Sequence, residues 1–455
     1  MIKPITSVKE IVWPAIPSVS ASIKLALQYQ LDESQWWSVD KMQQHQFKQF
    51  KLVLQHALET IPFYQNLYKE NVWSLDNEIT VDDFKSLPVI SRKQVQQAGA
   101  QLESVNIPAS HGKITYKSTS GSTGTSLVTK GTEIGGALFA AHTLRDHFWH
   151  KRDLSKTLAV IRLTHNDVSE PPEGIRYPAW GMSTGGIYNS GPSHVLSVQT
   201  SIKEQWTWLK KINPEYLLIY PSSLRGILEL SKNEPGVLTK LREVSTLAEV
   251  VTDELRETVK TLWNVPLSDM YSSVEIGYMA LQCPDYEHYH IQSESVILEV
   301  LDENNQACQP GEIGRIVITT LHNFATPLIR YEIGDYAMVG EPCACGRGLP
   351  VLKKIMGRER NLVTLPDGSK RWVRVGVDLY RDIKAIKKFQ MIQHTLTDIE
   401  VKIVCEPMLN KEQENQLLKN LIDSMTYSFD FKFHYVEDIP RSKGGKFEDF
   451  ISHVK

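Results

Sequence analysis

A regular alternation of strand-like and helix-like segments in the middle of the chain most constrains its fold. The short apolar runs 157–161 and 216–220 are typical of buried strands, and the stretches 201–212 and 222–231 have helical spacing. Strands that alternate with helices form layered structures, because each helix covers one face of a sheet. The sequence therefore predicts an α/β fold for this region.

The regions on either side have different patterns. The apolar residues of 47–58 recur at helical spacing and Pro62 should end that helix, which predicts a helical N-terminal region. The segments 295–301 and 314–320 are rich in Val and Ile, with a turn at 309–311 between them. They predict a β-rich subdomain.

The pattern restarts after Gly357. A turn at 366–368, a strand-like run at 399–404, a polar helix at 411–424 and a last strand before Pro440 predict an α+β domain of about a hundred residues. We therefore expect an α/β protein with a large multi-layer N-terminal domain at 1–356, which contains the β-rich subdomain, and a small C-terminal domain at 357–455.

Composition narrows the partners. The 455 residues are 41% hydrophobic and 23% charged with a net charge of −3, and they contain no long Lys/Arg block. A nucleic-acid binder or a polybasic membrane anchor is therefore not expected, and a small-molecule partner is. Charged residues and prolines interrupt 1–30, so we expect no signal peptide, no membrane span and a cytoplasmic location.

A run of hydroxyl residues and glycines at 118–125 follows the strand-like segment 114–116. Glycines allow close approach of a phosphate, and N–H groups and hydroxyls donate to its oxygens, so the run can wrap a polyphosphate. A flexible Ser/Thr/Gly loop is the alternative. The residues concerned are Thr119, Ser120, Gly121, Ser122, Thr123 and Gly124.

Two later segments could complete a nucleotide site. Tyr271 and Glu275 lie four residues apart, and Asp335 follows a β-rich stretch. An aromatic ring can stack on adenine, a Glu can hold Mg²⁺, and an Asp can accept both ribose hydroxyls. A packed tyrosine and solvated acids are the alternative for each.

Basic residues lie near the inferred domain boundary and near the C-terminus. Arg358 and Arg360 are in the segment 357–360, and Lys446 is on the glycine-containing loop 440–446. A lysine on such a loop can balance the charge that builds up on an α-phosphate as pyrophosphate leaves. An exposed basic loop is the alternative.

The order of these segments resembles that of the acyl-adenylate-forming superfamily, and within it the phenylacetate-CoA ligase and capsular-polysaccharide ligase-like branch. The resemblance covers most of the chain. It includes Trp36 and Trp37, the segment 61–64, the phosphate loop, 271–275, 311–314, 330–335, 357–360 and the terminal lysine loop.

The resemblance implies specific residue roles and ATP and Mg²⁺ as cofactors. Residues 119–124 would hold the phosphates, Tyr271 would lie against adenine, and Asp335 would bind the ribose. Glu275 would bind Mg²⁺, Arg358 would contact the nucleotide, and Lys446 would drive adenylation. Arg360 would be the hinge about which a mobile C-terminal lid domain turns, with the active site between the domains.

The implied reaction joins a small carboxylic acid to AMP and then transfers the acyl group to a thiol or an amine, with CoA as the expected acceptor. An amide-forming or carrier-loading ligase in polysaccharide or secondary-metabolite biosynthesis is one alternative, and a non-catalytic relative is another. The sequence leaves open whether the chain forms a homodimer.

Three departures from the family pattern stand out. Val274 replaces the threonine that usually precedes the Mg²⁺ glutamate, and Arg360 replaces an acidic residue of many relatives. The phosphate loop continues into Ser126 and Leu127 rather than Pro-Lys. None of them removes the carboxylate, the ribose ligand or the lysine.

Four residues could form a closed tetrahedral Zn²⁺ site. They are Cys283, His290, Cys343 and Cys345. From spacing alone, buried thiols beside an exposed histidine are the alternative, and the five cysteines of the chain are too few for a secreted disulfide framework. Relatives in the same branch carry a similar pattern, so the resemblance favours structural zinc, with His288 as the alternative to His290.

The segment 181–185 matches the Gly-x-Ser-x-Gly nucleophile elbow of serine hydrolases. An elbow needs a preceding buried strand, which Pro178 should interrupt. The hydrolase interpretation is therefore disfavoured, and the stretch through Gly186 is expected to border an acyl pocket instead.

Overall fold

The computed structural model describes residues 4–69, 79–118, 127–164, 169–372, 379–425, 427–442 and 444–454. The chain divides into two compact units, which are Met1–Met356 with Lys443–Gly445, and Gly357–Ser442 with Lys446–Lys455. Each unit has an apolar core of its own.

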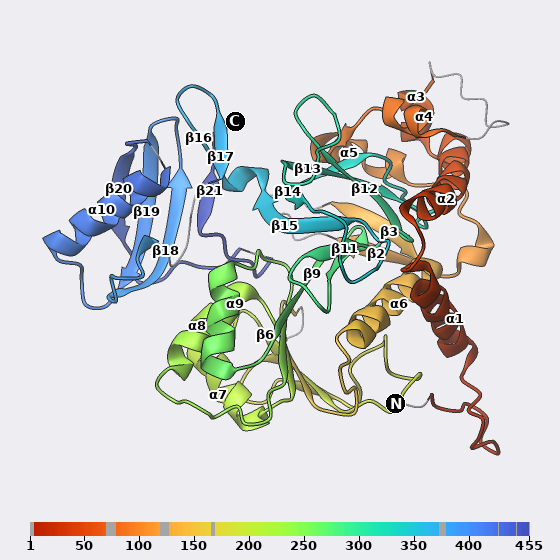
Figure 1. Cartoon of the computed structure of the whole chain (residues 1–455), viewed down its shortest axis with the longest axis horizontal. Coiled ribbons are helices and arrows are strands. Elements are labelled where there is room, and N and C mark those ends of the chain that lie inside the picture. Colours follow the sequence, from red (N-terminus) through yellow and green to blue (C-terminus); the bar gives the residue numbers. More distant parts are fainter. Residues whose placement is uncertain are drawn as a thin grey trace. The chain divides into compact units, whose positions relative to one another are not determined.

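A mixed sheet forms the centre of the first unit (Figure 1). Its parallel part consists of β4 (Leu158–Arg162), β6 (Ser193–Ser197), β7 (Tyr216–Ile219), β8 (Glu243–Thr246) and β9 (Leu267–Ser273), with β5 (Ile175–Tyr177) antiparallel to β6. The remaining strands are β1 (Ile90–Ser91), β10 (Gly277–Gln282), β11 (Tyr289–Ile291), β12 (Val296–Leu301), β13 (Ile313–Thr320), β14 (Tyr331–Val339) and β15 (Val351–Arg358). The order is β12-β13-β14-β15-β11-β10-β9-β8-β7-β4-β6-β5, and β1 pairs with β14.

Three helices pack on the parallel part: α7 (Ile202–Ile212), α8 (Pro221–Ser231) and α9 (Asp253–Trp263) (Figure 1). Ser201 begins α7 with a capping box, in which its side chain accepts from the Glu204 N–H and Glu204 accepts from the Ser201 N–H. Trp208 of α7 and Leu224 of α8 share one core with the apolar residues of β4 and β7. The predicted α/β fold is therefore confirmed for this region.

The described residues of the first unit contain six further helices. They are α1 (Val19–Ser34), α2 (Val39–Thr60), α3 (Pro62–Leu67), α4 (Val81–Ser86), α5 (Arg92–Ala98) and α6 (Glu133–Trp149), with 3-10 turns at Gly99–Leu102 and Ala109–His111. The predicted helix before Pro62 is α2, which buries Phe50, Leu54 and Ala57. Pro62 then opens α3 at its first turn, where a missing N–H costs nothing.

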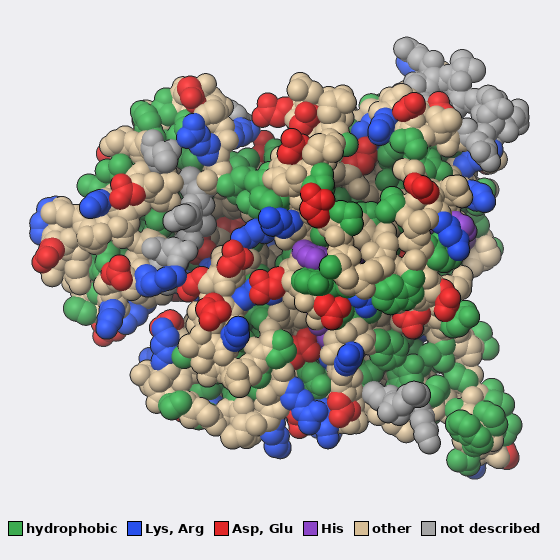
Figure 2. Space-filling model, viewed as in Figure 1, with side chains coloured by type: hydrophobic (Ala, Val, Ile, Leu, Met, Phe, Trp, Pro, Cys, Tyr) green, Lys and Arg blue, Asp and Glu red, His purple; other side chains and the backbone are tan. Residues whose placement is uncertain are grey.

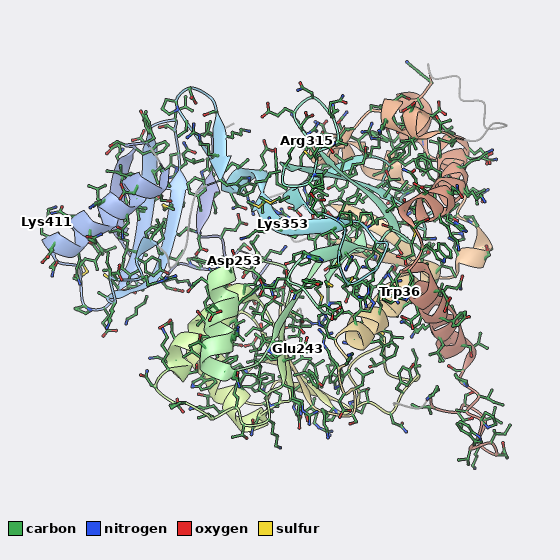
Figure 3. All side chains as sticks on the ribbon, in the orientation of Figure 1. Trp36, Glu243, Asp253, Arg315, Lys353 and Lys411 are labelled. Atoms are coloured by element: carbon green, nitrogen blue, oxygen red, sulfur yellow. The ribbon has the colours of Figure 1, made fainter. Side chains whose placement is uncertain are left out.

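Buried ion pairs hold α6 and the chain that follows it. Arg145 of α6 donates to Glu294 at 2.7 Å and to Gln292 at 2.8 Å. Arg152 contacts Asp146 of α6 and donates to Glu243 of β8 at 2.7 Å, and Figure 3 labels Glu243. Breaking such a pair from one side leaves an uncompensated buried charge. The position of α6 against the sheet is therefore strongly specified.

The second unit is a small α+β domain. Its strands are β16 (Leu362–Thr364), β17 (Lys370–Trp372), β18 (Ile386–Gln393), β19 (Asp398–Cys405), β20 (Asp430–Tyr435) and β21 (Phe450–Ser452), with a 3-10 turn at Glu359–Asn361 and the helix α10 (Lys411–Met425). Four of them form a sheet in the order β20-β19-β18-β21. The prediction that the last strand precedes Pro440 is wrong, because β21 follows and pairs parallel with β18. Three residues are too few for a periodic signal.

Candidate functional site

Tyr271 and Asp335 meet in the sheet of the first unit, although 64 residues separate them. The Tyr271 hydroxyl donates to Asp335 Oδ2 at 2.8 Å. Tyr271 ends up on β9 and Asp335 on β14, and both side chains are buried. The sheet therefore brings together the two residues expected at adenine and ribose.

Glu275 lies in the turn between β9 and β10 and is 4% exposed. Its Oε1 is 3.3 Å from Nη1 of Arg92, the first residue of α5, and the same Nη1 donates to the Tyr331 hydroxyl at 3.2 Å. A buried carboxylate needs a cation, and Arg92 supplies that charge here. The site can therefore hold positive charge at the position where Mg²⁺ is expected.

Arg92 is a site residue that the sequence interpretation missed. It follows Ser91, which caps α5 through a box with Gln94, so the local pattern indicates only a helix start. Its contact with Glu275 bridges 183 residues, and no spacing rule could have found it.

A cavity of about 60 Å³ lies beside Glu275. Its lining residues come from the β2–β3 hairpin (Ile114–Ser118 and Val128–Thr132), α6, the start of β10, the residue before β12, and the end of β13 with the loop that follows it. Phe139 of α6 stacks on Tyr278 with ring centroids 4.7 Å apart and forms an apolar wall. The cavity therefore has both apolar and polar lining residues.

Lys117 on β2 also lines this cavity. Burial lowers the pKa of the Lys117 ammonium, and the nearby charge of Glu275 acts in the opposite direction. The predicted phosphate residues Thr119 to Gly124 lie outside the described residues, between the two strands of this hairpin. Their role stays a prediction.

The three predicted basic residues of the second unit, Arg358, Arg360 and Lys446, make hydrogen bonds within that unit, through the side chain of Arg360 and through the backbone of the other two. Arg360 donates from Nε to Glu448 at 2.8 Å and makes a second contact with the same carboxylate. The Arg358 N–H donates to Asn361 Oδ1 at 2.9 Å, and the Lys446 carbonyl accepts from Ser442 at 2.9 Å. Arg360 is thus tied to a residue two positions after Lys446.

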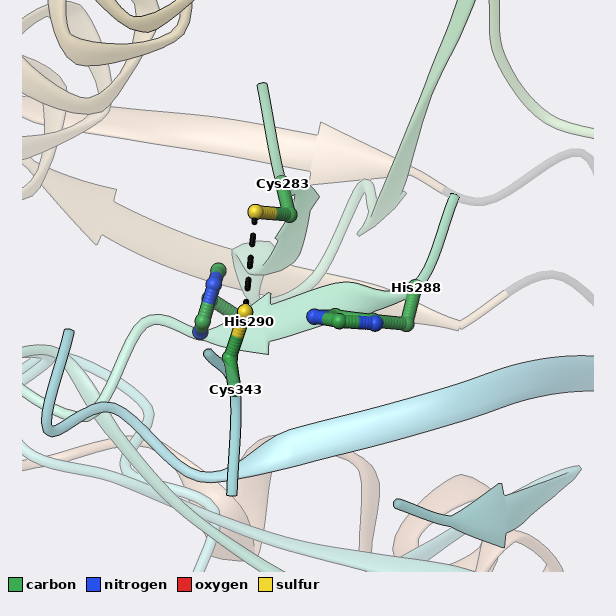
Figure 4. A group of neighbouring side chains, drawn as sticks. All are labelled: Cys283, His288, His290 and Cys343. Atoms are coloured by element: carbon green, nitrogen blue, oxygen red, sulfur yellow. Dashed lines mark hydrogen bonds between the residues drawn. The ribbon is translucent and has the colours of Figure 1, made fainter. Parts of the chain in front are cut away.

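The predicted metal ligands converge in the first unit (Figure 4). One potential ligand atom from each of Cys283, His288, His290 and Cys343 lies within 4.8 Å of the others. The two sulfurs are 3.9 Å apart, close to the roughly 3.8 Å between two thiolates on one tetrahedral Zn²⁺. Cys345 Sγ is 3.4 Å from His290 Nε2, so five candidate donors surround this point.

The chemistry of the donors fits a metal as well. Burial raises the pKa of Cys283 to about 12 and lowers that of His290 to about 4. His290 Nδ1 lies 3.2 Å from the Leu349 carbonyl, which orients the ring and leaves Nε2 for a metal. The predicted set named Cys345 as the fourth donor, whereas the compact group contains His288, because His288 stands beside His290 at a ring separation of 5.6 Å.

The segment 181–185 does not form a nucleophile elbow. β5 ends at Tyr177, and the Thr184 and Gly185 N–H groups both donate to the Gly181 carbonyl in a tight turn. An elbow would place the serine between a strand and a helix. This stretch is expected to border the acyl pocket. None of its residues is among the described residues that line the cavity beside Glu275.

The surface shows no concentration of one charge on the face in view. Figure 2 shows acidic and basic side chains interspersed over the described residues. None of the helices that the structure describes is both long and apolar enough to cross a membrane.

Comparison with known proteins adds independent information. Residues 372–453 match the family described as the CapK C-terminal domain. Protein CapK of Staphylococcus aureus is 21% identical, with coverage of 91% of this chain and 89% of CapK. A phenylacetate-coenzyme A ligase of Thermus thermophilus is 22% identical, with coverage of 85% and 86%.

Solved structures share the fold. A 2-hydroxyisobutyryl-CoA ligase in the postadenylation state, in complex with 2-HIB-AMP, matches with a TM-score of 0.73 at 14% identity, and the match covers 92% of this chain and 91% of that ligase. Together, the sequence relatives and the shared fold support one branch of the acyl-adenylate-forming superfamily as the group that this chain resembles, namely the branch of CapK and the phenylacetate-CoA ligases.

Proposed function

We propose that this protein is an ATP-dependent carboxylate ligase that forms an acyl-AMP and pyrophosphate and then transfers the acyl group to the thiol of CoA. The observation that carries the proposal is the hydrogen bond between Tyr271 and Asp335 in one sheet, with the buried Glu275 in the turn that follows the strand of Tyr271. These residues come from distant motifs, and the relatives named phenylacetate-coenzyme A ligase support the reaction class.

In the first half-reaction, an oxygen of the substrate carboxylate attacks the α-phosphorus of ATP, and the bond to the leaving pyrophosphate breaks. Tyr271 holds adenine, Asp335 accepts from the ribose hydroxyls, and the 119–124 run donates to the phosphates, with Arg358 at the nucleotide. Lys446 balances the charge of the leaving group. Glu275 would hold Mg²⁺, which supplies further positive charge to the phosphates.

In the second half-reaction, the acceptor sulfur attacks the acyl carbon and AMP leaves with the electron pair of the broken C–O bond. We propose that the C-terminal domain turns about Arg360 between the two steps, so that Lys446 is withdrawn and the acceptor is admitted. Transfer to an amine or a carrier protein in polysaccharide or secondary-metabolite biosynthesis is the second candidate. The match of residues 372–453 to the CapK C-terminal domain supports this second candidate function.

We further propose that the Cys/His cluster holds a structural Zn²⁺. Cys283, His290 and Cys343 would be ligands, with His288 or Cys345 as the fourth donor. Such a closed site would fix the loop before β15 to the β10–β11 hairpin and so stabilise the β-rich part beside the nucleotide residues. Cytoplasmic location stays a prediction.

Two measurements test the ligase proposal. Calorimetry should detect binding of ATP with Mg²⁺ by the full chain, and pyrophosphate release should appear with one or more acids of a panel. Lys446→Ala should abolish ATP-pyrophosphate exchange and leave transfer from a supplied acyl-AMP largely intact. Equal loss of both activities, or no heat with ATP and Mg²⁺, would contradict the proposal.

A further inference from the structure

The cavity beside Glu275 is small. Its volume of about 60 Å³ corresponds to roughly four to six water-sized groups at about 10–15 Å³ each. The ring and methylene of a phenylacetyl group, or a long alkyl chain, exceed this number. The size therefore favours a short acyl group.

The cavity lining contains a second polar group of residues beside the Lys117 and Glu275 pair. His142 of α6 is 2% exposed, and its Nε2 lies 2.7 Å from Ser295 Oγ. His322 lines the same cavity and lies close enough to His142 to affect its charge. Two imidazoles thus face a space that is otherwise walled by Leu138, Phe139 and Ile276.

Each of these histidines has a ring nitrogen without a partner. Among the described residues, Nδ1 of His142 and Nδ1 of His322 are buried and make no hydrogen bond. Gln292 approaches His142, but its oxygen accepts from Arg145 at 2.8 Å and its nitrogen donates to the His290 carbonyl at 2.9 Å. An unsatisfied buried polar atom is costly, and a ligand can remove that cost.

The other neutral polar residues of the cavity are already satisfied. Thr320 exchanges hydrogen bonds with the Leu328 backbone, and Asn323 donates to two carbonyls and accepts from two N–H groups. Thr132, Tyr278 and Ser295 each have a hydrogen-bond partner as well. Among the described residues, the two Nδ1 atoms are therefore the buried side-chain atoms of this lining that a substrate could complete.

The imidazoles are neutral at pH 7. Burial lowers the pKa of His142 to about 3, with the charge of Arg145 acting in the same direction, and burial lowers the pKa of His322 to about 4. A neutral ring does not balance a second carboxylate. A hydroxyl group suits it best, because a hydroxyl can donate to or accept from either tautomer.

We propose that the cavity selects a short carboxylic acid that carries a hydroxyl group, and that His142 and His322 recognise this hydroxyl. This inference rests on the proposed function, since it takes the cavity as the acyl pocket. It goes further in naming the chemical class of the acid and two specificity residues.

The test uses pairs of acids with three to five carbons that differ only in a hydroxyl at carbon 2, 3 or 4. Pyrophosphate release by the full chain should be roughly ten- to a hundredfold faster, as kcat/KM, for at least one hydroxy acid than for its deoxy partner. Succinate and β-alanine test for a second carboxylate and an ammonium, and phenylacetate tests for a larger acyl group.

Variants test whether the two histidines cause the preference for the hydroxy acid. His142→Leu and His322→Leu should each lower the ratio of kcat/KM for the hydroxy acid to kcat/KM for its deoxy partner, a ratio that a general loss of activity would not change. His142→Gln restores a hydrogen-bonding group in case the Leu variant does not fold, and should retain part of the preference. His45→Leu, at an exposed histidine of α2, is the matched control and should change neither rate.

The outcomes separate the two proposals. If ATP with Mg²⁺ binds but no hydroxy acid exceeds its deoxy partner, or if succinate, β-alanine or phenylacetate is the best acid, the hydroxy-acid inference is wrong and the ligase proposal stands. A preference that survives in both Leu variants would also overturn the role of the histidines. Failure to bind ATP would instead remove the ligase proposal, and the inference with it.

Discussion

The predicted nucleotide-binding residues Tyr271, Glu275 and Asp335 (the nucleotide residues) differ from the Cys/His cluster of the first unit in how their polar atoms are satisfied. Tyr271 donates to Asp335, and Glu275 pairs with Arg92. In the cluster, by contrast, two sulfurs and two imidazoles lie within 4.8 Å of one another. His288 Nε2 is buried there without a hydrogen-bond partner in the described part of the chain. The first arrangement is positioned by the protein alone, whereas we propose that a metal completes the second.

The largest effect should follow from Glu275→Gln, which removes the charge but keeps the shape. We expect pyrophosphate release to fall by about 10²–10³-fold, because the charge stabilisation at the phosphates is lost. Glu332→Gln is the matched control, since Glu332 pairs with Arg315 on β13 and is half-buried. If the Glu275 variant kept full activity, the nucleotide residues would not be a catalytic site.

Loss of the metal should cost stability rather than chemistry. Cys343→Ser should lower the free energy of unfolding by about 2–4 kcal/mol and remove bound zinc, as measured by urea unfolding and by metal analysis of the purified chain. Cys405→Ser in the second unit is the control. Equal zinc content in wild type and Cys343→Ser would refute the metal site.

Two further variants test which residue is the fourth ligand of the proposed metal site. His288→Ala and Cys345→Ala should differ in zinc affinity, and the compact group favours the greater loss for His288→Ala. A greater loss for Cys345→Ala would assign the contact between Cys345 and His290 to the coordination sphere.

The buried His142 should make stability depend on pH. Its pKa is lowered from 6.5 to about 3 by burial, so the folded state binds the proton less well than the unfolded chain. The contribution is present above pH 6.5 and is lost as the pH falls toward 3, about 2 kcal/mol of it by pH 5. Urea unfolding at pH 7 and pH 5 should show a smaller difference for His142→Gln than for wild type. An equal difference would mean that folding does not lower the pKa of His142.

The smallest effect is expected for Tyr271→Phe. The ring that we expect to face adenine remains, and only the hydrogen bond to Asp335 is lost, at a cost of about 1 kcal/mol. The KM for ATP should rise about fivefold with little change in kcat. A drop of several hundredfold in kcat would indicate that this hydroxyl acts in the chemistry itself.

Local signals predicted the elements of the parallel region well. The segments 201–212 and 216–220 became α7 and β7 within a residue or two, because a capping box and continuous apolar runs are encoded locally. The three-residue strand β21 escaped, since its place depends on pairing with β18.

Long-range contacts limited the prediction of the site. Motifs indicated Tyr271, Glu275 and Asp335, but Arg92 and His142 carry no motif and are functional candidates only because the fold places them at the site. His288 in the metal group was an alternative in the sequence and is a member of the compact group in space. Such residues cannot be found before the packing of α5, α6 and β11 is known.

The pairing of Arg360 with Glu448 has a mechanical consequence. Asn361 also donates to Glu448 and to the Phe450 carbonyl, so the start of the second unit is fastened to the chain just after Lys446. A change in the backbone torsion angles at residue 360, the proposed hinge, would therefore move the terminal loop and Lys446 together with the second unit.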